Sequence, residues 1–132
     1  MIIKLKGTVI NRIERSVHAD IENYPVRLVE YSYELDDPNF KGLAKVHYLV
    51  HEMDEGDLMP LLFRGFMKFE GEILKQKGSF LAHEDGAIHR GSTTVKGRIV
   101  DATEELSMLV GSYSFYQPLA DEPFDLLFDI EL

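Results

Sequence analysis

Histidines are the residues of this chain best suited to acid–base or metal chemistry. His47 and His51 stand four residues apart, a spacing that would chelate a metal ion on a helix. On a strand the two side chains share a face but lie roughly 13 Å apart, at about 3.3 Å of rise per residue. They could not hold one ion together, so we expect no metal site and no cofactor.

A third histidine, His83, stands beside Glu84 and Asp85. Neighbouring residues of a strand point to opposite faces, so His83 and Glu84 do not form a dyad. If His83 faces the interior together with Leu81, its imidazole would supply an acid, a base or a hydrogen-bond donor, because its unperturbed pKa is near 6.5. The structural alternative is a rim histidine or a hydrogen-bonded core histidine.

Other patterns that carry chemistry are missing from the sequence. With no Cys, disulfides, thiolate catalysis and Cys-based zinc sites are excluded. The acidic segment Asp54-Glu55-Gly56-Asp57 lacks the ligand spacing of a calcium-binding loop. The serines have no Gly-x-Ser-x-Gly context, and no glycine-rich loop suited to phosphates is present.

The segments that contain these residues have a hydrophobic period of two. The end of the chain shows it best: Phe124, Leu126, Phe128, Ile130 and Leu132 share one face. Such alternation is typical of a strand buried on one side. The same period predicts eight strands, which are residues 2–10, 26–35, 43–51, 61–70, 79–84, 91–100, 111–116 and 124–132.

Turn residues separate most of these strands. Asp85-Gly86 is a strong two-residue hairpin signal. The polar segment 14–25 has no clean period and is interpreted as a long connection. Residues 103–110 could form one short helical turn, since Asp101 precedes Glu104 by three residues and Gly111 follows. No linker or repeat divides the chain, so we expect a single domain over residues 1–132.

Many short strands with regular turns indicate an all-β fold, and an even number of strands lets an antiparallel sheet close on itself. We therefore predict a closed antiparallel eight-stranded β-barrel. A barrel of eight strands has room for packed side chains or for one small ligand. The periodicity does not say which face of each strand lines the interior.

Composition and charge limit the partners. The 132 residues are 45% hydrophobic and 28% charged, which are values of a globular protein. The formal net charge of −9 repels phosphate backbones, so we expect no nucleic-acid binding. No stretch resembles a membrane span or a signal peptide, and we expect a cytoplasmic protein. A homo-oligomer stays compatible with the sequence.

The second half of the chain carries a family resemblance. Phe69-Glu70-Gly71, Gly78-Ser79-Phe80 with the following His83, and the block from Glu105 to Phe115 resemble the motifs of the domain-of-unknown-function family 3224 (DUF3224). The resemblance implies a barrel similar to allene oxide cyclase, within the wider calycin-like group, and no assigned activity. The chain has Met67 and His47 where members of the family often carry acidic residues.

The function expected from these observations is binding of a small, largely apolar molecule inside the barrel. Pockets of that kind are mostly hydrophobic, with a few polar groups that fix the orientation of the ligand. The candidates for those groups are His47, Tyr48, Arg64 and His83. One alternative is an isomerase or cyclase acting on a hydrophobic substrate, by analogy with the fold alone. The other is a structural or interaction protein whose barrel is filled.

Overall fold

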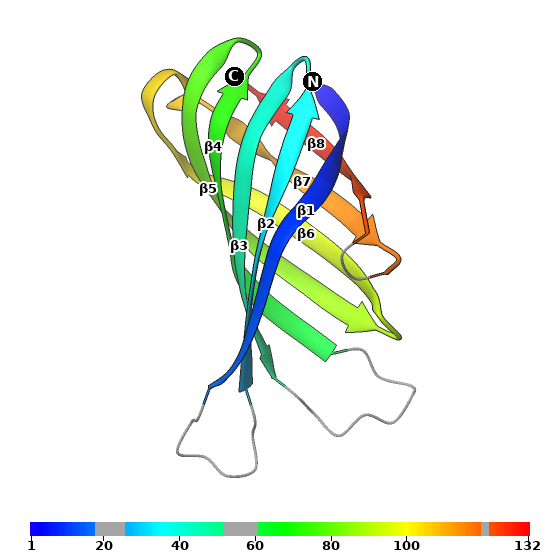
Figure 1. The fold of residues 1–132 in the computed structure, drawn as a ribbon. Coiled ribbons are helices and arrows are strands. Elements are labelled where there is room, and N and C mark those ends of the chain that lie inside the picture. The colour runs from blue at the N-terminus through cyan, green and yellow to red at the C-terminus, as the bar shows by residue number, and fades with distance from the viewer. Residues whose placement is uncertain (18–25, 52–60, 120–121) are drawn as a thin grey trace.

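The computed structural model describes residues 1–17, 26–51, 61–119 and 122–132, and these form one closed antiparallel barrel (Figure 1). Each strand pairs with the next along the chain, and the last strand pairs with the first. The eight strands are β1 (Ile2–Val17), β2 (Val26–Asp37), β3 (Phe40–His51), β4 (Leu61–Ile73), β5 (Gln76–His89), β6 (Ser92–Ala102), β7 (Val110–Gln117) and β8 (Phe124–Glu131). The predicted fold class is confirmed.

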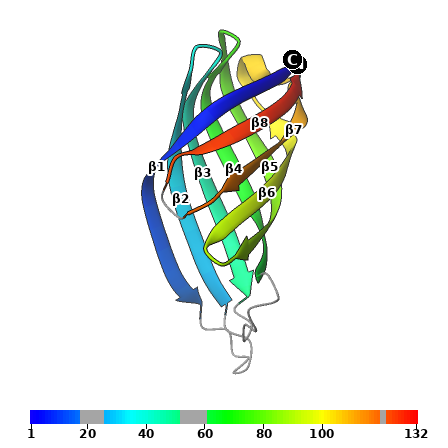
Figure 2. The same ribbon diagram turned by 90° about the vertical axis from the view of Figure 1, so that its right-hand side faces the viewer.

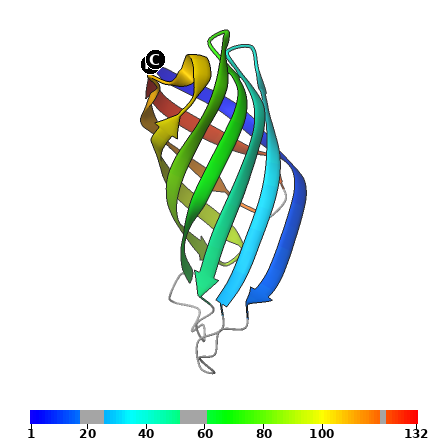
Figure 3. The same ribbon diagram turned by 90° about the vertical axis from the view of Figure 1, so that its left-hand side faces the viewer.

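The wall of the barrel is built from long and short strands. Strands β1 to β5 have 12 or more residues each, whereas β7 and β8 have 8. Both chain termini lie at one end of the barrel, and the β5–β6 hairpin lies at the other (Figures 2 and 3). We call the end away from the termini the mouth of the barrel.

The predicted alternation of faces is confirmed on most strands. Along β8 the side chains of Phe124, Leu126, Phe128 and Ile130 are buried, and the residues between them are exposed. Leu132 was expected in the same row, but it is exposed because β8 ends at Glu131. On β4, Phe63, Met67 and Phe69 are buried, whereas Phe66 lies on the outer face, 49% exposed.

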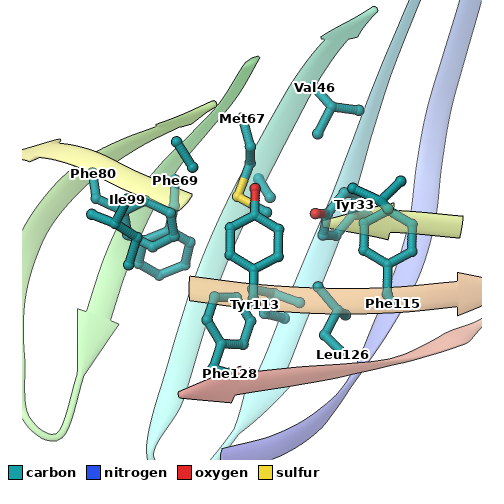
Figure 4. Packing of buried hydrophobic residues seen from close by; sticks show 14 of the residues in the cluster. Tyr33, Val46, Met67, Phe69, Phe80, Ile99, Tyr113, Phe115, Leu126 and Phe128 are labelled. Carbon is teal, nitrogen blue, oxygen red and sulfur yellow. The ribbon is translucent and has the colours of Figure 1, made fainter. Parts of the chain in front are cut away.

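Aromatic side chains fill the end of the barrel that holds the termini. The ring of Phe40 lies 5.0 Å from that of Phe69 and 4.6 Å from that of Phe128, measured between ring centroids. Phe69 also stacks on Phe80 at 5.1 Å, and Figure 4 shows several of these rings packed together. Rings at such distances add to the stability that comes from burial of their apolar area.

The connection after β6 contains the predicted helical turn. It is a 3₁₀ helix of three residues, η1 (Glu104–Leu106). Leu106 and the following Leu109 are buried in the hydrophobic core. The described residues contain no helix with the length and hydrophobicity needed to cross a membrane.

One predicted turn is wrong, and the start of one predicted connection is wrong. Asp85 and Gly86 lie inside β5, and the hairpin turn comes later, at Arg90 and Gly91, which both have positive φ. Gly86 serves packing instead, because a side chain there would overlap the ring of Phe63. The segment 14–25 begins as strand, since β1 continues to Val17, and residues 18–25 lie outside the described part of the chain, as does the acidic segment 54–57.

A pair of adjacent substitutions in β8 tests the assignment of its faces. Phe128 is fully buried against the rings of Phe40 and Tyr113, whereas Asp129 is exposed. Phe128→Ala should cost about 3–5 kcal/mol of unfolding free energy, as is usual for a buried Phe. Asp129→Ala should cost within about 0.5 kcal/mol, as for most surface positions. Urea denaturation of the two variants measures both values, and equal losses would contradict the assignment.

Candidate functional site

A carboxyl group lies in the middle of the otherwise apolar interior. Glu84 of β5 is 2% exposed, and its two oxygens are both hydrogen-bonded. The hydroxyl of Tyr48 on β3 donates to Oε1, and the hydroxyl of Tyr113 on β7 donates to Oε2. Both tyrosines are buried as well. The three side chains form one hydrogen-bonded unit, which we call the Tyr–Glu–Tyr unit.

Two glycines make this unit possible. In the sheet register, Tyr48 pairs with Gly65, Gly65 with Glu84, Glu84 with Gly97, and Gly97 with Tyr113. A Cβ atom at Gly65 would overlap the ring of Tyr48, and one at Gly97 would overlap the ring of Tyr113. Each tyrosine therefore extends across a neighbouring strand that has no side chain at that level, and it reaches Glu84 from its own side.

The interior changes the protonation of Glu84. Burial raises the pKa of its carboxyl group from 4.5 to about 7, although the hydrogen bonds from Tyr113 and Tyr48 lower it. Loss of hydration penalises the ionised carboxylate, and donated hydrogen bonds stabilise it. The pKa values of Tyr48 and Tyr113 are raised well above 10 by burial and by the charge of Glu84. At neutral pH the carboxyl group is thus the one that titrates.

Two further tyrosines surround the unit. The ring of Tyr31 meets that of Tyr48 edge to face, with centroids 5.5 Å apart. Tyr33 is fully buried, and its hydroxyl has no hydrogen-bond partner among the described residues. In Figure 4 the hydroxyl groups of Tyr33 and Tyr113 point toward the same part of the interior. A buried hydroxyl without a partner is uncommon. The hydroxyl of Tyr33 is thus a polar group of this cluster whose hydrogen bond is not satisfied by the described residues.

A cavity of about 120 Å³ lies at the mouth of the barrel and extends inward to Tyr48. Its apolar lining includes Val29, Val50 and Ile88, and its polar lining includes Thr93 and Gln117. Charged side chains also line it, and these are Arg12, Glu14 and Arg27. We call this cavity the mouth pocket, and it places a small, mainly apolar space against one tyrosine of the Tyr–Glu–Tyr unit.

The structure separates the four residues expected to bind a ligand. Tyr48 faces the interior and lines the mouth pocket. His47, Arg64 and His83 point outward, where they border a groove of about 470 Å³ together with the ring of Phe66. The suggestion that His83 faces inward with Leu81 is wrong, because Phe80, Ala82 and Glu84 occupy the inner face of β5.

Two of the polar side chains of the outer groove lie close to carboxylates. Arg64 Nε lies 3.2 Å from Asp85 Oδ1, and His47 Nε2 lies 3.7 Å from a carboxylate oxygen of Glu30. The ring of His83 meets that of Phe66 edge to face, 5.0 Å between centroids. In the described ranges, no three His, Asp or Glu side chains are grouped so that they could hold a metal ion.

The sequence interpretation missed Glu84 and Tyr113 as site residues. A signal for Glu84 was present, because it lies two residues from Ala82 and four from Phe80 and so shares their face of the strand. A glutamate on an apolar face breaks the pattern of a core strand, and buried carboxyl groups are rare unless they are paired. That break in the pattern was the available clue to the site.

The raised pKa of Glu84 predicts a pH-dependent contribution to stability. The carboxyl group releases its proton more readily in the unfolded chain than in the folded one, so stability falls as the pH rises from about 4.5 through 7. Relative to the Glu84→Gln variant, which cannot titrate, the wild-type protein should lose about 3 kcal/mol over that range.

Urea denaturation at several pH values between 5.5 and 8.5 measures most of this loss, because about 2 kcal/mol of it falls in that interval. The chosen range stays above the sequence pI of about 4.9. Asp85→Asn, which changes the neighbouring carboxylate on the outer face, should leave the pH dependence as in the wild type. A difference between wild type and Glu84→Gln that does not change with pH would contradict the burial of an ionisable Glu84.

Comparison with known proteins supports the fold. No protein-family model matches the chain, and no curated protein matches it. The structure is similar to the crystal structure of a protein of unknown function from the DUF3224 family of Shewanella oneidensis MR-1, with a TM-score of 0.69, 12% identity and coverage of 100% of both chains. The resemblance to the DUF3224 family noted in the sequence is thus confirmed at the level of the barrel fold.

Proposed function

We propose that this protein binds a small, largely apolar molecule in the mouth pocket. The observation that carries the proposal is the contrast between the two ends of the interior. Aromatic rings fill the end near the termini, whereas a cavity of about 120 Å³ remains at the mouth. Apolar cavities of about 150 Å³ hold a benzene-sized molecule. The mouth pocket suits one ring, with a substituent directed toward its opening.

The lining of the pocket indicates how such a molecule would lie. Val29 and Val50 are fully or almost fully buried and would contact its apolar body. Thr93 and Gln117, both buried polar side chains that line the pocket, would hydrogen-bond a polar substituent. This combination of an apolar wall and a few polar groups is typical of small-molecule sites.

The outer groove is larger, but it supports the proposal less well. It lies on the outside of the sheet, and its charged groups already pair with each other, as Arg64 does with Asp85. Burial of a ligand there would have to separate exposed ion pairs for little gain. The mouth pocket encloses a molecule of about one ring on more sides than the outer groove does. Such enclosure supports affinity because it buries apolar area of the ligand.

Toluene, an apolar ring without charged or polar groups, tests the proposal. Added to the protein, it should raise the melting temperature, since a ligand that binds only the folded state stabilises it. In ¹⁵N–¹H NMR spectra, the largest shifts should fall on amides around Val29, Val50 and Ile88, which line the mouth pocket.

Two adjacent substitutions in β3 make the test specific. Val50→Phe places a ring in the pocket and should weaken toluene binding by about tenfold or more, which corresponds to about 1.4 kcal/mol. Leu49→Phe, on the outer face, should leave binding unchanged. Circular dichroism confirms that both variants fold, because overpacking in a core costs stability of its own. Shifts centred on Leu49 and Phe66 would overturn the proposal and favour the outer groove.

A further inference from the structure

Tyr48 connects the buried carboxyl group with the mouth pocket. Its hydroxyl donates to Oε1 of Glu84, and its side chain lines the pocket. A hydroxyl has one proton to donate and two lone pairs that can accept. What Tyr48 offers to a molecule in the pocket therefore depends on which partner gives the proton in its hydrogen bond with Glu84.

We infer that the proton on Glu84 determines whether the hydroxyl of Tyr48 donates or accepts a hydrogen bond toward the pocket, and that the ligand is a carbonyl compound that accepts a hydrogen bond there. This inference rests on the proposed function, because it requires a ligand in the mouth pocket. When Glu84 is protonated, its acid group donates to the oxygen of Tyr48, and Tyr48 donates to the ligand. When Glu84 is ionised, Tyr48 must donate to the carboxylate, and the ligand meets only lone pairs.

Tyr113 is compatible with both the protonated and the ionised state of Glu84. Tyr113 donates to Oε2, whereas Tyr48 bonds to Oε1. A protonated Glu84 that carries its hydrogen on Oε1 still accepts from Tyr113 through Oε2. No hydrogen bond of the unit has to break when the sense of the Tyr48 bond reverses, so the change needs no rearrangement of the barrel.

The surroundings leave Glu84 as the group that titrates. At its level, the flanking strands β4 and β6 contribute only Gly65 and Gly97. The other ionisable groups that face it are tyrosines, and the pKa values resolved for three of them are raised well above 10. Strands β1 and β8 contribute apolar side chains to the same interior, including Leu5 and Phe128. The charged side chains that line the pocket, each partly exposed, are Arg12, Glu14 and Arg27.

Burial favours the state in which Tyr48 donates to the ligand. The apolar interior raises the pKa of Glu84 to about 7, so both protonation states are populated near neutral pH. The ligand is then a neutral acceptor, because the wall of Val29, Val50 and Ile88 disfavours burial of a charge. A ketone or aldehyde oxygen on an apolar body has this chemistry.

Two neutral molecules of similar size test the inference. Acetophenone accepts hydrogen bonds but does not donate them, and indole donates through its N–H. Because the pKa of Glu84 is about 7, the protonated fraction falls from nearly all at pH 5.5 to about 3% at pH 8.5. Acetophenone should therefore bind up to about thirtyfold more weakly at pH 8.5, since affinity scales with the competent fraction. Indole should bind no more weakly at the higher pH.

Three variants separate this role from a structural one. Glu84→Gln should remove the pH dependence of acetophenone binding, and Asp85→Asn, its outer-face control, should retain it. Tyr113→Phe removes a hydrogen bond that lowers the pKa of Glu84, so the midpoint of the pH dependence should move to higher pH. A merely structural Tyr113 would not move that midpoint. Circular dichroism and urea denaturation verify that each variant is folded.

The outcomes distinguish the inference from the proposed function. If toluene binds but acetophenone shows no pH dependence, the inference is overturned and the proposed function stands. A pH dependence that persists in the Glu84→Gln variant also overturns it, since another group would then be responsible. If neither toluene nor acetophenone nor indole binds at either pH, the proposed function fails and the inference fails with it.

Discussion

The interior of this barrel is organised around one carboxyl group, that of Glu84, which is almost completely buried. An ionised Glu84 would be costly in apolar surroundings, and an unbonded one would also lose its hydrogen bonds to water. Two tyrosine hydroxyls satisfy its oxygens. Those hydroxyls reach it only because Gly65 and Gly97 have no side chains to block the rings. Five positions on five successive strands therefore depend on one another.

Such an arrangement is not needed for stability alone. Buried polar networks can be replaced by apolar residues of similar shape with little loss, and sometimes with a gain. Glycines inside strands also lower stability, because they lose more conformational freedom on folding and pack less surface. The chain nevertheless has a glutamate, two glycines and two tyrosines along a single row. Groups with a pKa near neutral in a buried site are frequent at functional sites, which is consistent with a role for this row.

The fold could be predicted from the sequence because alternation is strong where one face of a strand is buried. The row of apolar residues predicted for β8 is buried on one face, apart from Leu132, which lies beyond the end of the strand. Boundaries were less accurate. Asp85-Gly86 has the composition of a turn, yet long-range pairing with β4 and β6 keeps both residues in the strand. Tertiary pairing of this kind is not visible in a local pattern.

The site was harder to predict for the same reason. Of the four candidates, Tyr48 faces the interior, whereas His47, Arg64 and His83 were chosen by their chemistry without knowledge of which face lines the interior. Neighbouring side chains of a strand point to opposite faces, so an error of one residue exchanges the inner and the outer set. His47, Arg64 and His83 belong to the outer set. Tyr113 is 29 residues from Glu84, and nothing local links them. The pairing of β5 with β6 and of β6 with β7 brings the two side chains together.

The two tight hairpins at the ends of β5 also constrain how this chain can change in evolution. Gly65 pairs with Glu84 across the turn at Leu74 and Lys75, and Gly97 pairs with it across the turn at Arg90 and Gly91. One inserted residue in either turn would slide the register and bring a side chain to the level where a tyrosine ring now crosses. Homologues that retain the site should therefore conserve the spacing from Gly65 through Glu84 to Gly97 without gaps.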